Sequence, residues 1–295
     1  MGLYTSPHLK VVQERIQINS QPVQKDLFAK YVFEVWSQLE SKDSPKPRYL
    51  QLLMLVAIHT FIRESVDVAI CETHNGGEYD ATNIFAHPVA TGIVTIGMDH
   101  VLQLGPTIEN IAWHKSGIFK SGTPAFSLSQ EHEAATVLRC RAREKNVSLE
   151  FVDDDTVNNS DVLATKTTIQ RRNASLAQRL ANAFLVRKGR ASSHVLTPHD
   201  IREGAKQFNW NGRFQQIIHG SHKWFLDGAH NEMSVPYTAQ WFADIVSKDL
   251  GYVKRRFMEL FHPDLDVQTV EPGSASASLQ PHIGARRGCN TMDYC

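Results

Sequence analysis

The feature that most constrains the fold is the alternation of short apolar runs with longer amphipathic segments. The runs are too short for helices, are β-branched in part, and are bounded by polar or turn-forming residues. Four of them occupy residues 66–71, 89–96, 123–128 and 148–152. Strands that alternate with helices in this way predict a parallel sheet with helices on both faces.

Helical spacing of apolar residues is equally clear. It predicts helices over residues 26–39, 48–63, 107–118, 131–145, 173–187, 198–208 and 234–246. The first of these places Leu27, Phe28, Tyr31, Val32, Val35 and Leu39 on one face. Thr197 is the expected N-cap of helix 198–208. Two further strands, 213–218 and 223–226, are expected around the turn at Gly220 and Ser221.

Composition excludes several classes of function. Lys+Arg and Asp+Glu both number 31, so the formal net charge is zero, and neither a nucleic-acid-binding stripe nor a polybasic membrane patch is expected. The longest apolar stretch, residues 50–62, is too short and too polar to span a bilayer. The four cysteines show no CxxC spacing, which favours a reducing, intracellular setting over a disulfide framework.

The residues at the start of the sequence, MGLYTS, fit the loose pattern for N-myristoylation. The alternative, which we favour, is that Met1 only marks where the sequence was started. The tail from residue 251 onward is expected to be disordered, because it is rich in Gly, Ser, Ala and Pro and has little periodicity.

Polar residues follow two of the predicted strands. Glu72 comes directly after run 66–71, and His100 comes shortly after run 89–96. Ligands of open α/β sheets gather beyond the carboxyl ends of the strands. These two side chains are therefore candidates for a binding or catalytic site.

The first motif is TSPHL at residues 5–9, followed by ERIQIN at residues 14–19. It resembles the start of the folate-binding loop of the folylpolyglutamate synthases, a family of the Mur ligase superfamily, in a fungal-like form. The resemblance implies that Ser6 is a Mg²⁺ ligand and that Thr5, Pro7 and His8 contact folate. A hydroxyl oxygen is a suitable hard donor for Mg²⁺. The alternative for an isolated Ser-Pro pair is a simple turn.

The second motif is ETHNGGEYDATN at residues 72–83. It is similar to the family's segment of an acid, a glycine-rich turn and a Y/F-D-x-T-N sequence, and the similarity implies that Glu72 binds Mg²⁺. His74 departs from the pattern, because the family usually has glycine there. Paired glycines allow a close backbone approach or a positive φ. The alternative for Glu72 is a capping or salt-bridged acid.

The third motif combines GMDH at residues 97–100 with TIENIAWHKSGI at residues 107–118. It resembles the family's DH…TIE.IA..KAGI block, with Ser116 in place of the usual Ala. The resemblance implies that His100 is a further Mg²⁺ ligand and that Lys115 is carbamylated. Carbamylation would turn the cationic side chain into an oxygen donor.

Three later segments complete the resemblance. QRRNASLA at residues 170–177 places Asn173 on the adenine side of ATP, with a helix N-cap as the alternative role. WNGRF at residues 210–214 is similar to the family's WPGR motif and implies that Arg213 reaches the ATP phosphates. FLDGAHN at residues 225–231 resembles the signature that places Asp227 and His230 between the nucleotide and the incoming glutamate.

The family's first strand and its phosphate-binding loop have no counterpart in this sequence. The pattern G-x-x-x-x-G-K-[S/T] does not occur in the 295 residues. Such a loop supplies backbone N–H groups, a lysine and a hydroxyl to the phosphates and the metal. We therefore expect a chain truncated at both ends, whose activity depends on phosphate contacts that this sequence does not supply.

The resemblance implies an α/β fold, with a parallel-sheet, Mur-ligase-type ATPase domain at 1–210 and a partial α/β glutamate-ligase domain at 211–250. The implied activity is an ATP- and Mg²⁺-dependent ligase that adds L-glutamate to tetrahydrofolate or its polyglutamates through an acyl phosphate. The implied partners are ATP, L-glutamate and the folate, with no nucleic acid and no membrane span. A monomer in the cytosol or the mitochondrion is expected.

Three alternatives remain open at this stage. The first is a catalytically dead folate-binding or regulatory fragment, motivated by the missing phosphate-binding loop. The second is a related Mur-type ligase for another carboxylate. The third is a metal-binding protein, suggested by the 14 histidines, which are scattered without ligand spacing.

Overall fold

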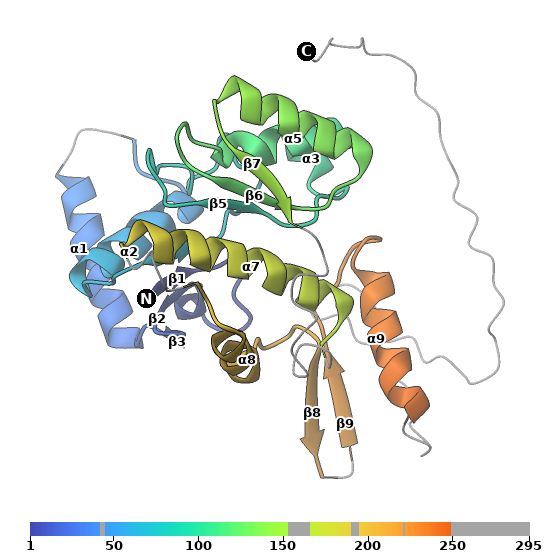
Figure 1. The fold of residues 1–295 in the computed structure, drawn as a ribbon. Coiled ribbons are helices and arrows are strands. Elements are labelled where there is room, and N and C mark those ends of the chain that lie inside the picture. The colour runs from blue at the N-terminus through green and yellow to red at the C-terminus, as the bar shows by residue number, and fades with distance from the viewer. Residues whose placement is uncertain (42–44, 153–165, 190–194, 221, 249–295) are drawn as a thin grey trace. The chain divides into compact units, whose positions relative to one another are not determined.

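The structure, a computed structural model, divides into two compact units, Met1–Asn209 and Trp210–Cys295 (Figure 1). It describes residues 1–41, 45–152, 166–189, 195–220 and 222–248. The expected tail at 251–295 and the acidic segment at 153–165 lie outside the described residues.

The first sheet has four strands in the order β3-β2-β1-β4. Their bounds are β1 (Gly2–Tyr4), β2 (Ile16–Ile18), β3 (Gln21–Pro22) and β4 (Ala69–Cys71). β1 runs parallel to β4 but antiparallel to β2, which in turn is antiparallel to β3. Of these four strands, only β4 was predicted from the sequence, and as a longer strand. β4 is the outer strand of this sheet, and its Ile70 side chain is 51% exposed.

Two helices pack against this sheet, α1 (Lys25–Glu40) and α2 (Tyr49–Arg63). Both helices were predicted, and so was the apolar face of α1 that meets the core. The buried members of this core are Tyr4, Ile16, Val23, Tyr31, Leu53, Met54, Val56, Ala57 and Phe61. β1 lies very close to α2, because a Cβ on Gly2 would be 2.5 Å from the Phe61 ring.

The second sheet is fully parallel, with the order β5-β6-β7. It consists of β5 (Thr91–Ile93), β6 (Ala125–Leu128) and β7 (Leu149–Val152). α4 (Ile108–Lys115), the 3₁₀ turn η2 (Ser116–Ile118) and α5 (His132–Glu144) lie on one face, and α7 (Thr168–Arg187) lies on the other (Figure 1). The prediction of a parallel sheet covered on both faces is confirmed here.

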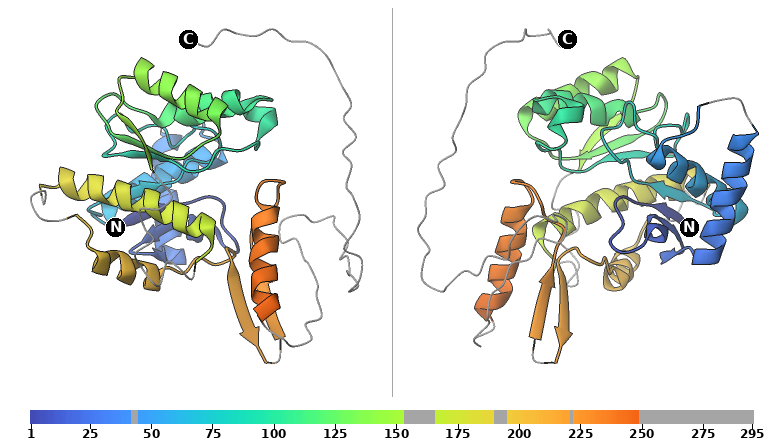
Figure 2. Two further views of the ribbon diagram at one scale, coloured as in Figure 1. Left: turned by 45° about the vertical axis from the view of Figure 1, so that its right-hand side comes forward. Right: turned by 180° about the vertical axis from the view of Figure 1, so that it is seen from behind.

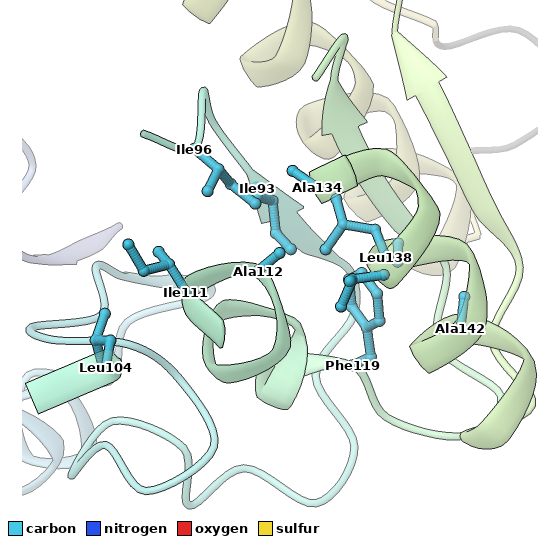
Figure 3. Close-up of a cluster of buried hydrophobic side chains, with 11 residues drawn as sticks. Ile93, Ile96, Leu104, Ile111, Ala112, Phe119, Ala134, Leu138 and Ala142 are labelled. Atoms are coloured by element: carbon cyan, nitrogen blue, oxygen red, sulfur yellow. The ribbon is translucent and has the colours of Figure 1, made fainter. Parts of the chain in front are cut away.

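Each face of this sheet has its own core. The side under α4 and α5 is filled by a cluster of small and branched side chains around Phe119 (Figure 3). Its buried members are Ile93, Ile96, Leu104, Ile111, Ala112, Phe119, Ala125, Ala134, Val137, Leu138 and Ala142. Leu104 comes from α3 (Val101–Leu104), a single turn that the sequence analysis did not predict. On the α7 side, Leu128 and Val152 pack against Leu176.

α7 begins at Thr168, five residues before the predicted start. The Thr167 hydroxyl accepts the Gln170 N–H at 3.3 Å, and the Gln170 side-chain oxygen accepts the Thr167 N–H at 3.0 Å. This reciprocal capping box fixes the N-terminus of the helix. Asn173 therefore lies inside α7, and the alternative that it is an N-cap is wrong. The predicted N-cap Thr197 is confirmed, because its hydroxyl accepts the Asp200 N–H at the start of α8 (Pro198–Gln207).

The second unit contains the hairpin of β8 (Gln215–His219) and β9 (His222–Leu226), followed by α9 (Val235–Lys248). Figure 2 shows α9 alongside the hairpin in both views. Edge-to-face aromatic contacts join them, with Phe225 at 5.6 Å from Trp241 and 4.9 Å from Phe242 between ring centroids. Such contacts give a small unit much of its apolar burial.

In the described part of the chain, no helix has both the length and the apolar character needed to cross a lipid bilayer.

We predict that Leu138→Ala lowers the free energy of unfolding by about 2–5 kcal/mol, because the side chain is fully buried and its removal leaves a cavity. Leu102→Ala is the matched control, since Leu102 is 93% exposed on α3, and it should change stability by less than about 0.5 kcal/mol. Urea denaturation measures both. Equal effects of the two substitutions would contradict the assignment of the core.

Candidate functional site

Ser6 and Glu72 meet at the carboxyl ends of two neighbouring parallel strands. Ser6 lies two residues beyond β1, and Glu72 follows β4 directly. The Ser6 N–H donates to Glu72 Oε2 at 3.1 Å, and the Glu72 N–H donates to the Tyr4 carbonyl at 2.9 Å. The parallel pairing of β1 with β4 therefore brings together two predicted site residues that are 66 positions apart.

Arg15 anchors the TSPHL loop through hydrogen bonds. It closes the 3₁₀ turn η1 (Val12–Arg15) and is only 7% exposed. Its guanidinium donates from Nη1 to Ser6 Oγ at 2.8 Å and from Nε to His8 Nδ1 at 2.9 Å. The Thr5 N–H donates to the Arg15 carbonyl at 2.9 Å. One buried arginine thus orients three of the predicted loop residues.

Glu14 caps the same loop on its other side. Its carboxylate accepts the backbone N–H groups of Leu9 at 2.7 Å, Lys10 at 3.1 Å and Val11 at 3.1 Å. Partial burial raises the pKa of Glu14, but these three hydrogen bonds outweigh it and lower the pKa below its usual value. Glu14 and Arg15 belong to a motif that carries the resemblance, but no role was predicted for either residue. Their charge beside a Ser-Pro turn was the signal that could have found them.

His100 lies at the start of α3 with a left-handed backbone, φ 53°. Its N–H donates to Asp99 Oδ1 at 2.8 Å, and its ring Nε2 is 3.7 Å from Asp99 Oδ2. The ring is 44% exposed. His100 is therefore paired with its own neighbour, and a histidine with positive φ marks a backbone that the surrounding structure holds in place.

Lys115 ends α4 in a partly buried position. Burial lowers the pKa of its amine, while the carboxylates of Asp99 and Asp80 act in the opposite direction. No hydrogen bond or ion pair joins the Lys115 amine to another described residue. A desolvated amine without a direct partner has an increased neutral fraction and is nucleophilic.

Asp80 is the most heavily hydrogen-bonded acid of this region. It accepts the N–H of Asn75 at 2.8 Å, the N–H of Thr82 at 2.9 Å and the Thr82 hydroxyl at 2.8 Å. Burial raises its pKa, but the hydrogen bonds from His74, Asn75 and Thr82 lower it far more, and the net pKa lies well below the usual value. The carboxylate is therefore ionised at neutral pH.

The paired glycines of the second motif approach the protein's own backbone. Gly76 has φ +80°, and a Cβ on Gly77 would be 2.6 Å from the His114 carbonyl oxygen. A Cβ on Gly117 would be 2.2 Å from the backbone of Glu78. The glycines of two separate motifs thus pack the loop at 73–83 onto the end of α4, next to Lys115.

The oxygen donors at the ends of β1 and β4 fit a hard divalent cation, because a hydroxyl and a carboxylate are both suitable for Mg²⁺. Lys115 fits only after conversion to a carbamate, since an ammonium would repel the cation. His100 offers a nitrogen, which is not among the oxygen ligands that Mg²⁺ prefers. Among the described residues, no group of three or more His, Cys, Asp or Glu side chains has the geometry of a metal site.

Asn173 lies on the exposed side of α7 in the first unit. The other predicted nucleotide and glutamate residues belong to the second unit. Asp227 Oδ2 accepts the Phe214 N–H at 2.7 Å, while Oδ1 accepts the Ala229 N–H at 2.9 Å and the Thr238 hydroxyl at 2.8 Å. Asp227 therefore connects the end of β9 to the start of β8 and to α9.

Arg213 and His230 lie on either side of this aspartate in sequence. A Cβ on Gly228 would be 1.5 Å from Arg213 Nη1, so the arginine packs directly on the Gly228 backbone. His230 Nδ1 is 2.9 Å from the Gly228 carbonyl, which fixes Nδ1 as the protonated nitrogen. The second unit thus brings Arg213, Asp227 and His230 together around one glycine.

The fold and these residues together identify the class of protein. The α/β fold with its parallel sheet is that of the Mur-ligase type. The solved structures it resembles include an apo L. casei FPGS (TM-score 0.73, 25% identity, 83% of this chain and 64% of that chain) and an FPGS–AMPPCP complex (TM-score 0.74, 26% identity, 83% and 66%). A third is a Mycobacterium tuberculosis folylpolyglutamate synthase with ADP (TM-score 0.71, 26% identity, 82% and 59%).

The chain is a homologue of the folylpolyglutamate synthases. It is 43% identical over 255 residues to the Neurospora crassa folylpolyglutamate synthase, covering 83% of this chain and 48% of that protein. It is 38% identical over 301 residues to the Saccharomyces cerevisiae folylpolyglutamate synthase, covering 96% and 54%. The chain therefore spans about half the length of the curated relatives it matches. No family model matches it.

We predict that Asp80→Asn lowers the free energy of unfolding at pH 7 by about 1.5–3 kcal/mol, because a charged acceptor of several hydrogen bonds is lost. The folded-state pKa of Asp80 is depressed, so its contribution is present above the unfolded-state pKa of about 3.9 and declines as the pH falls below it. Denaturation curves at neutral and acidic pH should show the two proteins converging. A constant difference across this range would contradict the prediction.

A second prediction concerns the glycine contact. Gly117→Ala should lower the free energy of unfolding by about 1–3 kcal/mol or more, because its Cβ would overlap backbone atoms of Glu78. Gly204→Ala on α8 is the control: a Cβ there meets nothing within 4 Å, and the change should stabilise the helix by about 0.5–1 kcal/mol. Opposite shifts in melting temperature are expected, and shifts of the same sign would rule the close packing out.

Proposed function

We propose that this chain carries the folate loop and the metal-binding residues of an ATP-dependent ligase that adds L-glutamate to tetrahydrofolate or its polyglutamates. The observation that carries the proposal is the meeting of Ser6 and Glu72 at the ends of β1 and β4. It occurs in a chain that is homologous to folylpolyglutamate synthases over most of its length.

The reaction has two steps. A carboxylate oxygen of the folate's terminal glutamate attacks the γ-phosphorus of ATP, which gives an acyl phosphate and releases ADP. The amine of L-glutamate then attacks the acyl carbon, loses a proton and expels phosphate, which leaves an amide. Both steps bring anions together, so positioning and charge stabilisation are the main contributions required of the protein.

The folate would bind along the TSPHL loop, at Thr5, Pro7 and His8. One similar solved structure is an FPGS–AMPPCP–folate complex, with a TM-score of 0.69 and 25% identity over 83% of this chain. The loop is well suited to hold a ligand in one orientation, because Glu14 caps three of its N–H groups and Arg15 fixes Ser6 and His8. A ligand that meets a preorganised loop loses less binding energy to ordering it.

Ser6 and Glu72 would hold Mg²⁺, and His100 and a carbamylated Lys115 would complete the set. When bound, Mg²⁺ supplies positive charge that offsets the charge of the phosphates. Arg15 would keep Ser6 Oγ oriented by occupying one of its two lone pairs, which leaves the other for the cation.

Lys115 would react as a free amine with CO₂. The ammonium first releases one proton. The lone pair of the neutral amine then attacks the carbon of CO₂ and the nitrogen releases a second proton, which leaves an anionic carbamate. Burial favours this reaction, because it lowers the pKa of the amine and increases the neutral fraction. The carbamate oxygens would then be hard donors of the kind that Mg²⁺ prefers.

The second unit would serve ATP and glutamate. Arg213 offers a guanidinium fork suited to phosphate oxygens. Asn173 belongs to α7 of the first unit and would offer its amide to the adenine edge. Asp227 holds the surrounding turn through three hydrogen bonds, and His230 keeps Nε2 available to a substrate because Nδ1 is bonded to Gly228. The expected division into a domain at 1–210 and one at 211–250 is part of this proposal.

A second candidate function is folate binding without turnover. The observation that favours it is the absence of G-x-x-x-x-G-K-[S/T] from the 295 residues, because that loop holds the phosphates in enzymes that use it.

The deciding experiment incubates the purified chain with tetrahydrofolate, L-glutamate, ATP and Mg²⁺ and follows chain elongation by mass spectrometry. We expect elongation that requires all four components, and Glu72→Gln should reduce the rate by at least about 10- to 100-fold. Glu203→Gln on α8 is the control and should leave the rate unchanged. Folate binding without elongation would favour the second candidate, and the absence of both would rule out the proposal.

A further inference from the structure

His74 stands where the family pattern has glycine, and its side chain is buried beside the candidate site. Its side chain is 4% exposed and lies between two partners from different segments. Nε2 is 2.6 Å from the Tyr4 hydroxyl, and Nδ1 is 3.2 Å from Asp80 Oδ1. The Tyr4 and His74 rings also meet edge to face, with centroids 5.3 Å apart.

The partners determine where the protons lie. The Asp80 carboxylate is ionised at neutral pH and can only accept, so His74 Nδ1 carries a proton. Burial raises the pKa of Tyr4 to about 12, so the phenol keeps its proton as well. In a neutral imidazole ring, Nε2 then accepts the Tyr4 O–H. With that tautomer, the hydrogen bonds of the three side chains all run in one direction, from Tyr4 to His74 to Asp80.

This chain of hydrogen bonds connects the two segments that carry the candidate metal ligands. Tyr4 ends β1, two residues before Ser6, and its carbonyl accepts the N–H of Glu72. Asp80 organises the loop that follows Glu72, because it accepts N–H groups of Asn75 and Thr82. His74 therefore links the end of β1 to the far side of the loop that begins at Glu72.

A glycine at this position would leave a cavity between Tyr4 and Asp80. The Tyr4 hydroxyl would lose its acceptor, and Asp80 would lose a donor, in a region from which water is largely excluded. A buried polar group without its partner costs about 1–3 kcal/mol. This chain therefore uses a buried histidine where the family pattern has backbone alone.

We propose that His74, as its Nδ1–H tautomer, is a positioning residue that locks the loop at 73–83 to β1 and so holds Glu72 against Ser6 for a divalent cation. The inference rests on the proposed function, since it concerns the same site. His74 is not itself a ligand in this arrangement, because both of its nitrogens are occupied by Tyr4 and Asp80.

The chain supplies a matched control in α2. His59 Nε2 is 2.6 Å from Glu34 Oε2, and its ring meets Tyr31 edge to face with centroids 5.3 Å apart. A tyrosine, a histidine and an acid thus also lie together between α1 and α2, although the acid is a glutamate and the Tyr31 hydroxyl donates to Glu64 rather than to the histidine. His59→Ala should change the stability of the protein without changing its affinity for the cation.

The experiment measures binding of Mn²⁺, as a probe for Mg²⁺, by the EPR signal of the free ion. We expect His74→Ala to weaken Mn²⁺ binding by about 10- to 100-fold, the range typical of residues that orient metal ligands. His74→Gln should retain most of the affinity, because its amide can accept from Tyr4 and donate to Asp80. Tyr4→Phe, which keeps the ring volume, should give an intermediate loss, and His59→Ala should bind Mn²⁺ as the unmodified protein does.

Nitrogen-15 NMR of the histidine rings supplies a readout independent of the metal. A protonated Nδ1 and an unprotonated Nε2 at His74 are expected, and the opposite tautomer would overturn the proposed direction of the hydrogen bonds. Unchanged Mn²⁺ affinity in a folded His74→Ala, alongside weakened binding in Glu72→Gln, would overturn the positioning role alone. If the unmodified chain binds no Mn²⁺, the metal site of the proposed function fails together with this inference.

Discussion

The close packing of the loop at 73–83 onto the end of α4 is the contact on which the rest of the first unit depends. Gly77 and Gly117 remove the side chains that would separate the two backbones, and the Glu78 N–H donates to the His114 carbonyl at 2.8 Å. Glu78 is then held by Arg141 of α5, through Nη2 at 2.5 Å, and by Lys145 directly after α5, through Nζ at 3.1 Å. Arg141 is largely buried, so loss of Glu78 would leave its desolvated charge with Glu144, at 2.8 Å, as the remaining ion-pair partner. This contact joins the core under α1 and α2 to the core under α4 and α5, and Lys115 lies at the junction.

Local patterns in the sequence predicted the elements that are long and periodic. The 3.6-residue spacing found α1, α2, α5 and α9 to within one or two residues. α1, α2 and α5 bury one face against a core, and α9 packs Trp241 and Phe242 on Phe225 of the hairpin. It did not find β1, β2 and β3, which have two or three residues each and exist because they pair with one another. Asn19 and Ser20, both with positive φ, form the tight turn between β2 and β3, and they were the only local signal of that hairpin.

The part of the candidate site that could be predicted from the sequence is the part that lies at the ends of strands. Glu72 was predicted because it follows a strand, and the carboxyl ends of parallel strands lie at one edge of a sheet. The parallel pairing of β1 with β4 explains the contact of Glu72 with Ser6. The groups that orient these ligands were not found. Arg15 bonds Ser6 and His8 across a turn, and His74 joins Asp80 to Tyr4, which is 70 positions away. Their roles therefore depend on the tertiary fold rather than on a spacing along the chain.

The outer edge of β4 is open to pairing with another strand, directly before the candidate metal ligand Glu72. The sequence there is apolar, β4 pairs with β1 alone among the described strands, and Ile70 is half exposed. An edge of this kind offers a row of free backbone donors and acceptors to any extended peptide. Many proteins protect such edges with lysine, proline or a bulge, and Ala69–Cys71 contains neither of those residues. A peptide that paired with this edge would end beside the candidate metal ligand Glu72, which directly follows β4.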